Sequence, residues 1–105
     1  MTNPTFRIDA FTVPAAARDT FLSRIRATHR VLRDQTGFRG DRIVERETAP
    51  GESRIVTIVE WADEAAIPAA VEAVKAAHAA DGFSPADFVR DNGIAADLGF
   101  YRPVA

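Results

Sequence analysis

Three features of the sequence predict an α+β domain in which helices cover a four-stranded antiparallel sheet. Four segments are rich in β-branched and aromatic residues, and turn residues such as Pro50 and Gly51 separate them. Between them lie one segment with helical apolar spacing and one alanine-rich segment of high helix propensity. The length of 105 residues, with 47% hydrophobic and 27% charged residues, is typical of one globular domain. We therefore expect a single domain over residues 1–105.

The first two elements are a strand over 5–13 and a helix over 15–34. Pro14 closes the strand, which has the sequence TFRIDAFTV. In the helix, apolar and weakly polar residues recur at spacings of one, three and four, which places them on one side: Phe21, Leu22, Ile25, Thr28, His29 and Leu32. Gly37 then supplies a stop signal.

A hairpin is predicted next, from strands over 41–48 and 54–61 around the Pro50-Gly51 turn. Residues 55–59 (IVTIV) are apolar on both faces of their strand. Helices on one side of an antiparallel sheet can cover only one of those faces. The sequence therefore predicts a homodimer, in which a second copy covers the other face.

The second half of the chain predicts two more helices and a final strand. Asp63 is a good N-cap, and Pro68 suits a first helical position, which predicts a short turn over 63–67 and a helix from Pro68 to Ala80. Ser84 and Pro85 begin a short helix that ends near Asn92, and residues 96–104 form the last strand. The order β-α-β-β-α-(α)-β is the ferredoxin-like arrangement.

Composition excludes several classes of protein. The chain has no cysteine, so disulfides, thiolate nucleophiles and cysteine-based zinc sites are impossible. No signal peptide and no apolar stretch of about 20 residues is present, so we expect a cytoplasmic protein without a membrane partner. A net charge of −2 and a pI near 5.6 argue against a nucleic-acid partner.

Arginine makes up twelve of the thirteen basic residues, and four arginines lie close together in the first helix. They are Arg24, Arg26, Arg30 and Arg33. On a helical wheel the last three fall opposite the apolar stripe. A solvated helix face is the simplest interpretation.

Several short motifs resemble the antibiotic biosynthesis monooxygenase family of the dimeric α+β barrel superfamily. They are Phe11-Thr12-Val13-Pro14, Gly37-Phe38, and Val59-Glu60-Trp61 followed by Asp63-Glu64-Ala65. Together with the element order, the resemblance covers nearly the whole chain. It implies a dimeric α+β barrel. Because the superfamily includes cofactor-free oxygenases, haem-degrading enzymes and isomerases, the shared fold does not assign the reaction.

The resemblance also implies a place for Trp61, since a tryptophan at this strand end tends to line the family's cavity. A large core aromatic is the alternative interpretation. The quinone-forming branch carries an Asn four residues before this Trp and a Tyr some six after it, where this chain has Thr57 and Ile67. The haem-degrading branch carries a His about ten residues after it, where this chain has Val71.

His29 and His78 are the two histidines, and both lie on the apolar sides of their predicted helices. Because both helices pack on the same sheet face, we expect the imidazoles to point toward one cavity, with His29 near its mouth. An imidazole is a natural base for a phenol near neutral pH. Alternatively, both are half-buried histidines bonded to backbone or water. No third ligand stands at a spacing typical of a metal site.

The resemblance implies, as the first hypothesis, a cofactor-independent monooxygenase that oxidises an aromatic, phenolic or quinol-like small molecule with O₂. His29 or His78 would be the base, and Tyr101 or Thr57 would donate to the substrate anion. The apolar slot would consist of Phe21, Ile25 and Trp61. No metal, flavin or haem is expected. A non-catalytic dimeric ligand-binding or stress-response protein is the second hypothesis, and a haem-binding or haem-degrading enzyme is the third.

Overall fold

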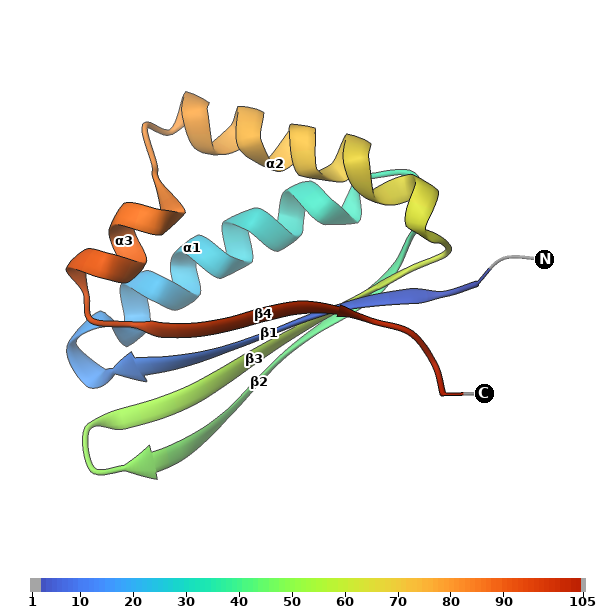
Figure 1. The fold of residues 1–105 in the computed structure, drawn as a ribbon. Coiled ribbons are helices and arrows are strands. Elements are labelled where there is room, and N and C mark those ends of the chain that lie inside the picture. Colours follow the sequence, from blue (N-terminus) through green and yellow to red (C-terminus); the bar gives the residue numbers. More distant parts are fainter. Residues whose placement is uncertain (1–2, 105) are drawn as a thin grey trace.

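The computed structural model describes residues 3–104 and has the predicted element order. The elements are β1 (Thr5–Pro14), α1 (Ala15–Arg33), β2 (Phe38–Ala49), β3 (Glu52–Trp61), η1 (Glu64–Ala66), α2 (Ile67–Ala80), α3 (Pro85–Asp91) and β4 (Ala95–Tyr101). The strands form one antiparallel sheet of order β2-β3-β1-β4. Figure 1 shows the three α-helices on the same face of this sheet. The predicted ferredoxin-like α+β fold is therefore confirmed.

Some boundaries differ from the sequence-based expectation. β2 begins at Phe38 rather than at residue 41, and Ala49 pairs with Glu52, so Pro50 and Gly51 alone form the turn. Gly51 has a φ of 75°, a conformation that favours glycine. β4 ends at Tyr101, whereas the strand was expected to continue to residue 104. Pro103 lies in this tail, and a proline has no N–H to donate to a strand ladder.

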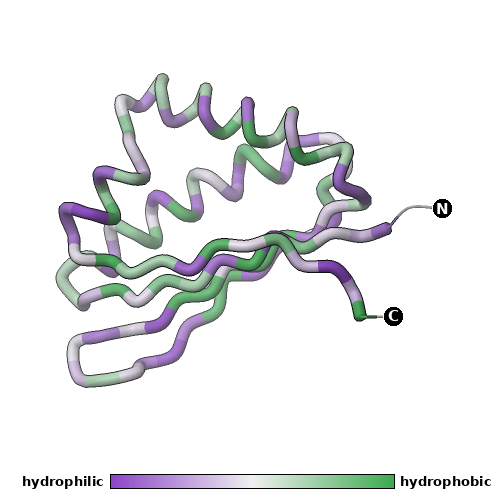
Figure 2. Tube along the Cα trace, viewed as in Figure 1, coloured by the Kyte–Doolittle hydropathy of each residue, from purple (hydrophilic) through white to green (hydrophobic). Residues whose placement is uncertain are grey.

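The two faces of the sheet are both partly apolar. Ile55, Val59 and Trp61 of β3 point toward the helices and are buried. Their neighbours point the other way, and Ile58 lies directly opposite Ile8 of β1 on that outer face. Figure 2 shows hydrophobic residues along the central strands as well as on the helices.

Two separate clusters of buried side chains hold the helices on the sheet. One lies under the start of α1 and consists of Phe11, Val13, Ala17, Phe21, Leu22, Ile55 and Ile94. The other lies under the start of α2 and consists of Val59, Trp61 and Ala70. Ala70 is the one buried residue of α2. The two clusters therefore leave space between them.

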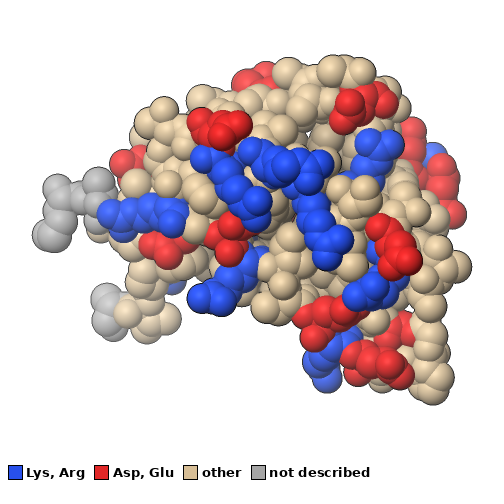
Figure 3. Space-filling view, turned by 180° about the vertical axis from the view of Figure 1, so that it is seen from behind, with Lys and Arg blue, Asp and Glu red and all other residues tan. Residues whose placement is uncertain are grey.

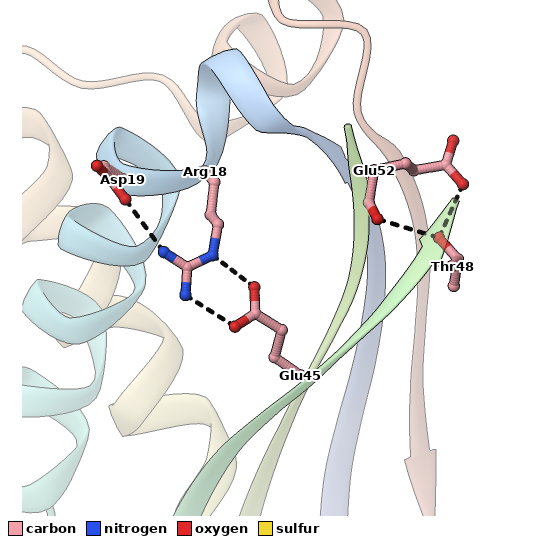
Figure 4. A network of polar contacts seen from close by, with 5 residues as sticks. All are labelled: Arg18, Asp19, Glu45, Thr48 and Glu52. Carbon is pink, nitrogen blue, oxygen red and sulfur yellow. Dashed lines mark hydrogen bonds and ion pairs between the residues drawn. The ribbon is translucent and has the colours of Figure 1, made fainter. Parts of the chain in front are cut away.

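A bidentate ion pair joins the beginning of α1 to β2. The Arg18 guanidinium donates from Nε to Glu45 Oε2 at 2.5 Å and from its second terminal nitrogen to Oε1 at 2.8 Å (Figure 4). It also lies 3.1 Å from Asp19. The hydrogen bonds from Arg18 lower the pKa of Glu45. This pair fixes the edge strand relative to α1, in the planar geometry that suits guanidinium and carboxylate.

Candidate active site

A cavity of about 590 Å³ lies between the helices and the sheet. Its walls include Phe11 and Phe21 from one core cluster and Val59 and Trp61 from the other. Its exposed rim comes from three elements: Val71 of α2, Pro85 and Ala86 of α3, and Leu98 and Phe100 of β4. The cavity therefore opens along the β4 edge of the sheet. Figure 1 shows α2 and α3 above this strand. The cavity's size and largely apolar lining suit a small aromatic molecule.

Polar groups concentrate on the α1–α2 side of the cavity, which we define by Arg24, Thr28 and His78. Thr28 Oγ1 lies 3.0 Å from His78 Nε2, so a hydrogen bond orients the imidazole. Burial first, and then the positive charge of Arg24, lower the pKa of His78 below its ordinary value of 6.5. His78 is consequently neutral at pH 7. In the tautomer whose Nε2–H donates to Thr28, Nδ1 is free to accept a proton.

Four charged residues, Arg24 among them, line the cavity wall or its mouth. Arg7 Nε lies 2.6 Å from Asp9 Oδ1, and the Arg7 guanidinium also stacks over Phe100, 4.8 Å from its ring centroid. Arg24 stacks over Phe83 at 4.2 Å, and exposed Lys75 stands on α2. The sequence analysis assigned none of these residues to a site. The signal was present for Arg7 and Asp9, which alternate with Phe11 on the helix-facing side of β1.

Four of the residues expected from the sequence do line this cavity, namely Phe21, Ile25, Trp61 and His78. Trp61 is 3% exposed and packs edge-on against Phe38, with ring centroids 5.9 Å apart. It is therefore a core residue with one side on the cavity, which reconciles the two interpretations.

Thr57, Tyr101 and His29 are not among the lining residues. Thr57 faces the helices, but its side chain is buried on the central strand β3, between Asp9 of β1 and Ile43 of β2. Tyr101 lies opposite Phe6, on the other face of the sheet, because alternate residues of a strand point to opposite sides. Neither side chain is placed to donate to a ligand in this cavity.

His29 points toward β2 rather than toward the cavity, so the two imidazoles do not meet as we expected. Its Nδ1 lies 2.8 Å from Asp41 Oδ2, and Arg33 donates to the same oxygen at 2.9 Å. Burial raises the pKa of Asp41, but the hydrogen bonds from Arg33 and His29 outweigh it and hold this pKa below 3.8. Helix geometry explains why Thr28 faces the cavity and His29 does not. Consecutive residues of a helix point about 100° apart, so the His29 side chain is turned toward the edge strand β2.

Residues 3–104 include no helix long and apolar enough to cross a membrane. Within the same range, no group of three or more His, Asp or Glu side chains is arranged to hold a metal ion.

Comparison with known proteins agrees with the resemblance noted in the sequence. Residues 6–82 match the sequence profile of the family described as antibiotic biosynthesis monooxygenase. The chain belongs to this family. No curated protein matches the sequence significantly.

Several solved structures share this fold. SnoaB, a cofactor-independent oxygenase from Streptomyces nogalater, is 24% identical with a TM-score of 0.65, and the alignment covers 98% of this chain and 95% of SnoaB. A protein assigned as a monooxygenase from Shewanella loihica PV-4 is 18% identical with a TM-score of 0.70 and coverages of 100% and 98%. The R26S variant of MhuD, solved with two manganese protoporphyrin IX molecules per active site, is 23% identical with a TM-score of 0.68 and coverages of 96% and 95%. At these identities the likeness concerns the fold.

Proposed function

We propose that this protein is a cofactor-independent monooxygenase that oxidises an aromatic, phenolic or quinol-like molecule with O₂. The observation that carries the proposal is the position of His78, a neutral imidazole on the wall of an otherwise apolar cavity of about 590 Å³. An imidazole of this kind can take the proton of a phenol. The resulting electron-rich anion then reacts with oxygen, while the apolar walls exclude water. Membership of the family and the fold shared with SnoaB support this assignment.

Different residues of the cavity would bind the substrate and remove its proton. Phe21, Ile25 and Trp61 would hold the aromatic rings, since all three line the cavity. His78 would be the base, and Thr28 would position it. His29 has no part in this proposal, because its Nδ1 is bound to Asp41 away from the cavity.

Oxygen uptake tests the proposal directly. Purified protein would be mixed with a panel of anthrone-type and quinol-type compounds in an oxygen electrode, with the spontaneous rate in buffer subtracted. We expect uptake above the spontaneous rate for at least one compound, with a mono-oxygenated product by mass spectrometry. Ligand binding to the cavity without any uptake would instead support the second hypothesis, a non-catalytic ligand-binding protein.

The third hypothesis, haem binding, has less support in the cavity. The position at which the haem-degrading branch carries its histidine is Val71, which stands on the rim. His78 lies two turns further along α2, where Thr28 already holds its Nε2. A haem titration without a shift of the Soret band would agree with this assignment.

We also propose that the protein is a homodimer formed by the outer faces of two sheets. Ile8, Ile58 and Val56 lie near the middle of that face, with Val44 and Tyr101 toward its edges. Val44 and Tyr101 are 47% and 50% exposed. A contiguous apolar face of this kind typically marks an interface. The cytoplasmic location expected from the sequence stays a prediction.

A further inference from the structure

Arg24 differs from the other arginines of α1. Arg26, Arg30 and Arg33 are exposed, and Figure 3 shows basic side chains gathered over this helix on the back of the molecule. Arg24 instead turns to the cavity, and its Cζ lies 4.2 Å from the centroid of the Phe83 ring. The helical wheel separates it from this basic face, because Arg24 and Thr28 are one turn apart and share the cavity side.

Arg24 forms no ion pair within the part of the chain that the structure describes, although Asp81 lines a smaller pocket together with Arg24 and His78. Arg7, the other arginine of the cavity, is paired with Asp9 at 2.6 Å. No carboxylate of residues 3–104 lies within ion-pair distance of Arg24. A half-buried guanidinium beside apolar walls has lost part of its hydration and gains from an anion in contact.

Arg24, Thr28 and His78 together offer two hydrogen-bonding partners and one positive charge at a single place in the cavity. Phe83 lies beside all three. Its ring contacts the Arg24 guanidinium and packs edge-on against the His78 ring, with ring centroids 5.3 Å apart. Val74 adds an apolar side chain to the lining nearby. An oxygen anion placed here would face a cation in a site of low dielectric, where the attraction is stronger than in water.

We propose that Arg24 is a catalytic residue that stabilises the phenolate formed when His78 removes the proton of a bound phenol. In this step the substrate O–H bond breaks, the proton passes to the imidazole, and a phenolate and an imidazolium result. The substrate therefore binds with its acidic hydroxyl at the α1–α2 side and its rings toward Trp61. This inference rests on the proposed function and adds to it the residue that stabilises the substrate anion and the orientation in which the substrate binds.

The energetics show why His78 needs such help. A phenol has a pKa of about 10, whereas the pKa of His78 is below 6.5, so proton transfer between them is unfavourable. A contacting positive charge lowers the pKa of an acid by about 1–3 units. Arg24 would supply that charge. The other charged groups near this place are Asp81, which raises the pKa of His78, Lys75 on α2 and the paired Arg7 and Asp9.

A chromogenic phenol tests the proposal without any turnover. 4-Nitro-1-naphthol absorbs at longer wavelength when ionised, so its pKa can be read in the complex by titration under anaerobic conditions. We expect the bound probe to have a pKa at least about one unit lower than in buffer. Arg24→Met should abolish the shift, and Arg24→Lys should retain part of it. Arg26→Met, on the exposed side of the same helix, is the matched control and should leave the shift unchanged.

A second ligand separates the charge of Arg24 from its packing on Phe83. The methyl ether of the probe cannot ionise, and Trp61, the single tryptophan, reports its binding by fluorescence. Arg24→Met should bind the ether within about twofold of the wild-type affinity while losing the pKa shift of the naphthol. Equal losses for both ligands, an unshifted or raised probe pKa in the wild-type protein, or no binding of the naphthol would overturn the proposal. A normal shift with no oxygen uptake on any substrate would instead contradict the oxygenase function alone.

Discussion

Thr28 and His78 are 50 residues apart in sequence, yet Thr28 Oγ1 lies 3.0 Å from His78 Nε2 and joins α1 to α2 beside the cavity. This hydrogen bond fixes the rotation of the imidazole. It also makes the base of the proposed reaction depend on how two helices pack, since neither helix alone sets the distance.

The first prediction concerns these two residues. Replacing His78 by Ala should lower turnover of an active substrate about 10²-fold or more, because the base is lost. Thr28→Val should lower it less, by roughly 10-fold, because the imidazole stays but loses its orienting hydrogen bond. Thr20→Val, on the exposed part of α1, is the control and should have full activity. Unchanged turnover in His78→Ala, with the fold intact by circular dichroism, would remove His78 from the mechanism.

The pH dependence of the reaction should follow the lowered pKa of His78. The base acts in its neutral form, so kcat/KM should stay constant above pH 7 and fall as the pH drops through the pKa of His78, below 6.5. The pKa of His78 is lowered because burial and the charge of Arg24 both disfavour the imidazolium. A profile of kcat/KM between pH 4.5 and 9 checks this. A midpoint above 6.5 would contradict the assignment.

Trp61 should contribute more to binding than to the chemical step. Trp61→Phe keeps an aromatic ring in the core and should preserve the fold, while weakening ligand affinity because part of the cavity wall is lost. Trp61→Ala should cost about 3–5 kcal/mol of unfolding free energy, since the residue is 3% exposed. Chemical denaturation and ligand titration measure the two effects. Loss of kcat at unchanged affinity in Trp61→Phe would show a direct catalytic role instead.

The Asp41 network should matter for stability rather than for activity. Asp41→Asn weakens the contacts with Arg33 and His29 and should destabilise the protein by about 1–3 kcal/mol at pH 7. Because the folded-state pKa of Asp41 is lowered, its contribution is complete well above 3.8 and is lost as the pH falls through the folded-state value. Urea unfolding at several pH values should show a smaller acid dependence in Asp41→Asn than in the wild type. Asp34→Asn, at an exposed position, is the control.

The proposed dimer predicts a defined mass in solution. Sedimentation at micromolar concentration should give twice the chain mass of 11.4 kDa, with an interface on the order of 2,000 Å² or more. Ile58→Asp places a charge in the middle of the outer sheet face, opposite Ile8, and should dissociate the dimer or raise its dissociation constant at least 100-fold. Arg30→Asp, on the exposed side of α1, should leave it intact. A wild-type monomer would refute the proposal.

The sequence by itself determined the order and type of the elements, because periodicity and turn chemistry act locally. The helical spacing around Phe21 and Ile25, the Pro50-Gly51 turn and the Ser84-Pro85 helix start each predicted an element that the structure contains. The place of Trp61 beside the cavity came from the family resemblance, and the structure has Trp61 there.

Tertiary structure alone decided which polar side chains share the cavity. The apolar stripe of α1 is broad, so adjacent residues such as Thr28 and His29 lie at its two borders, and the position of α2 decides which of them faces the cavity. The helical wheel left Arg24 off the solvated face of Arg26, Arg30 and Arg33 but gave it no role, because that role requires Phe83 and His78 from a segment more than 50 residues away. Side-chain direction on one element follows from local spacing, whereas the neighbours it meets depend on packing between elements.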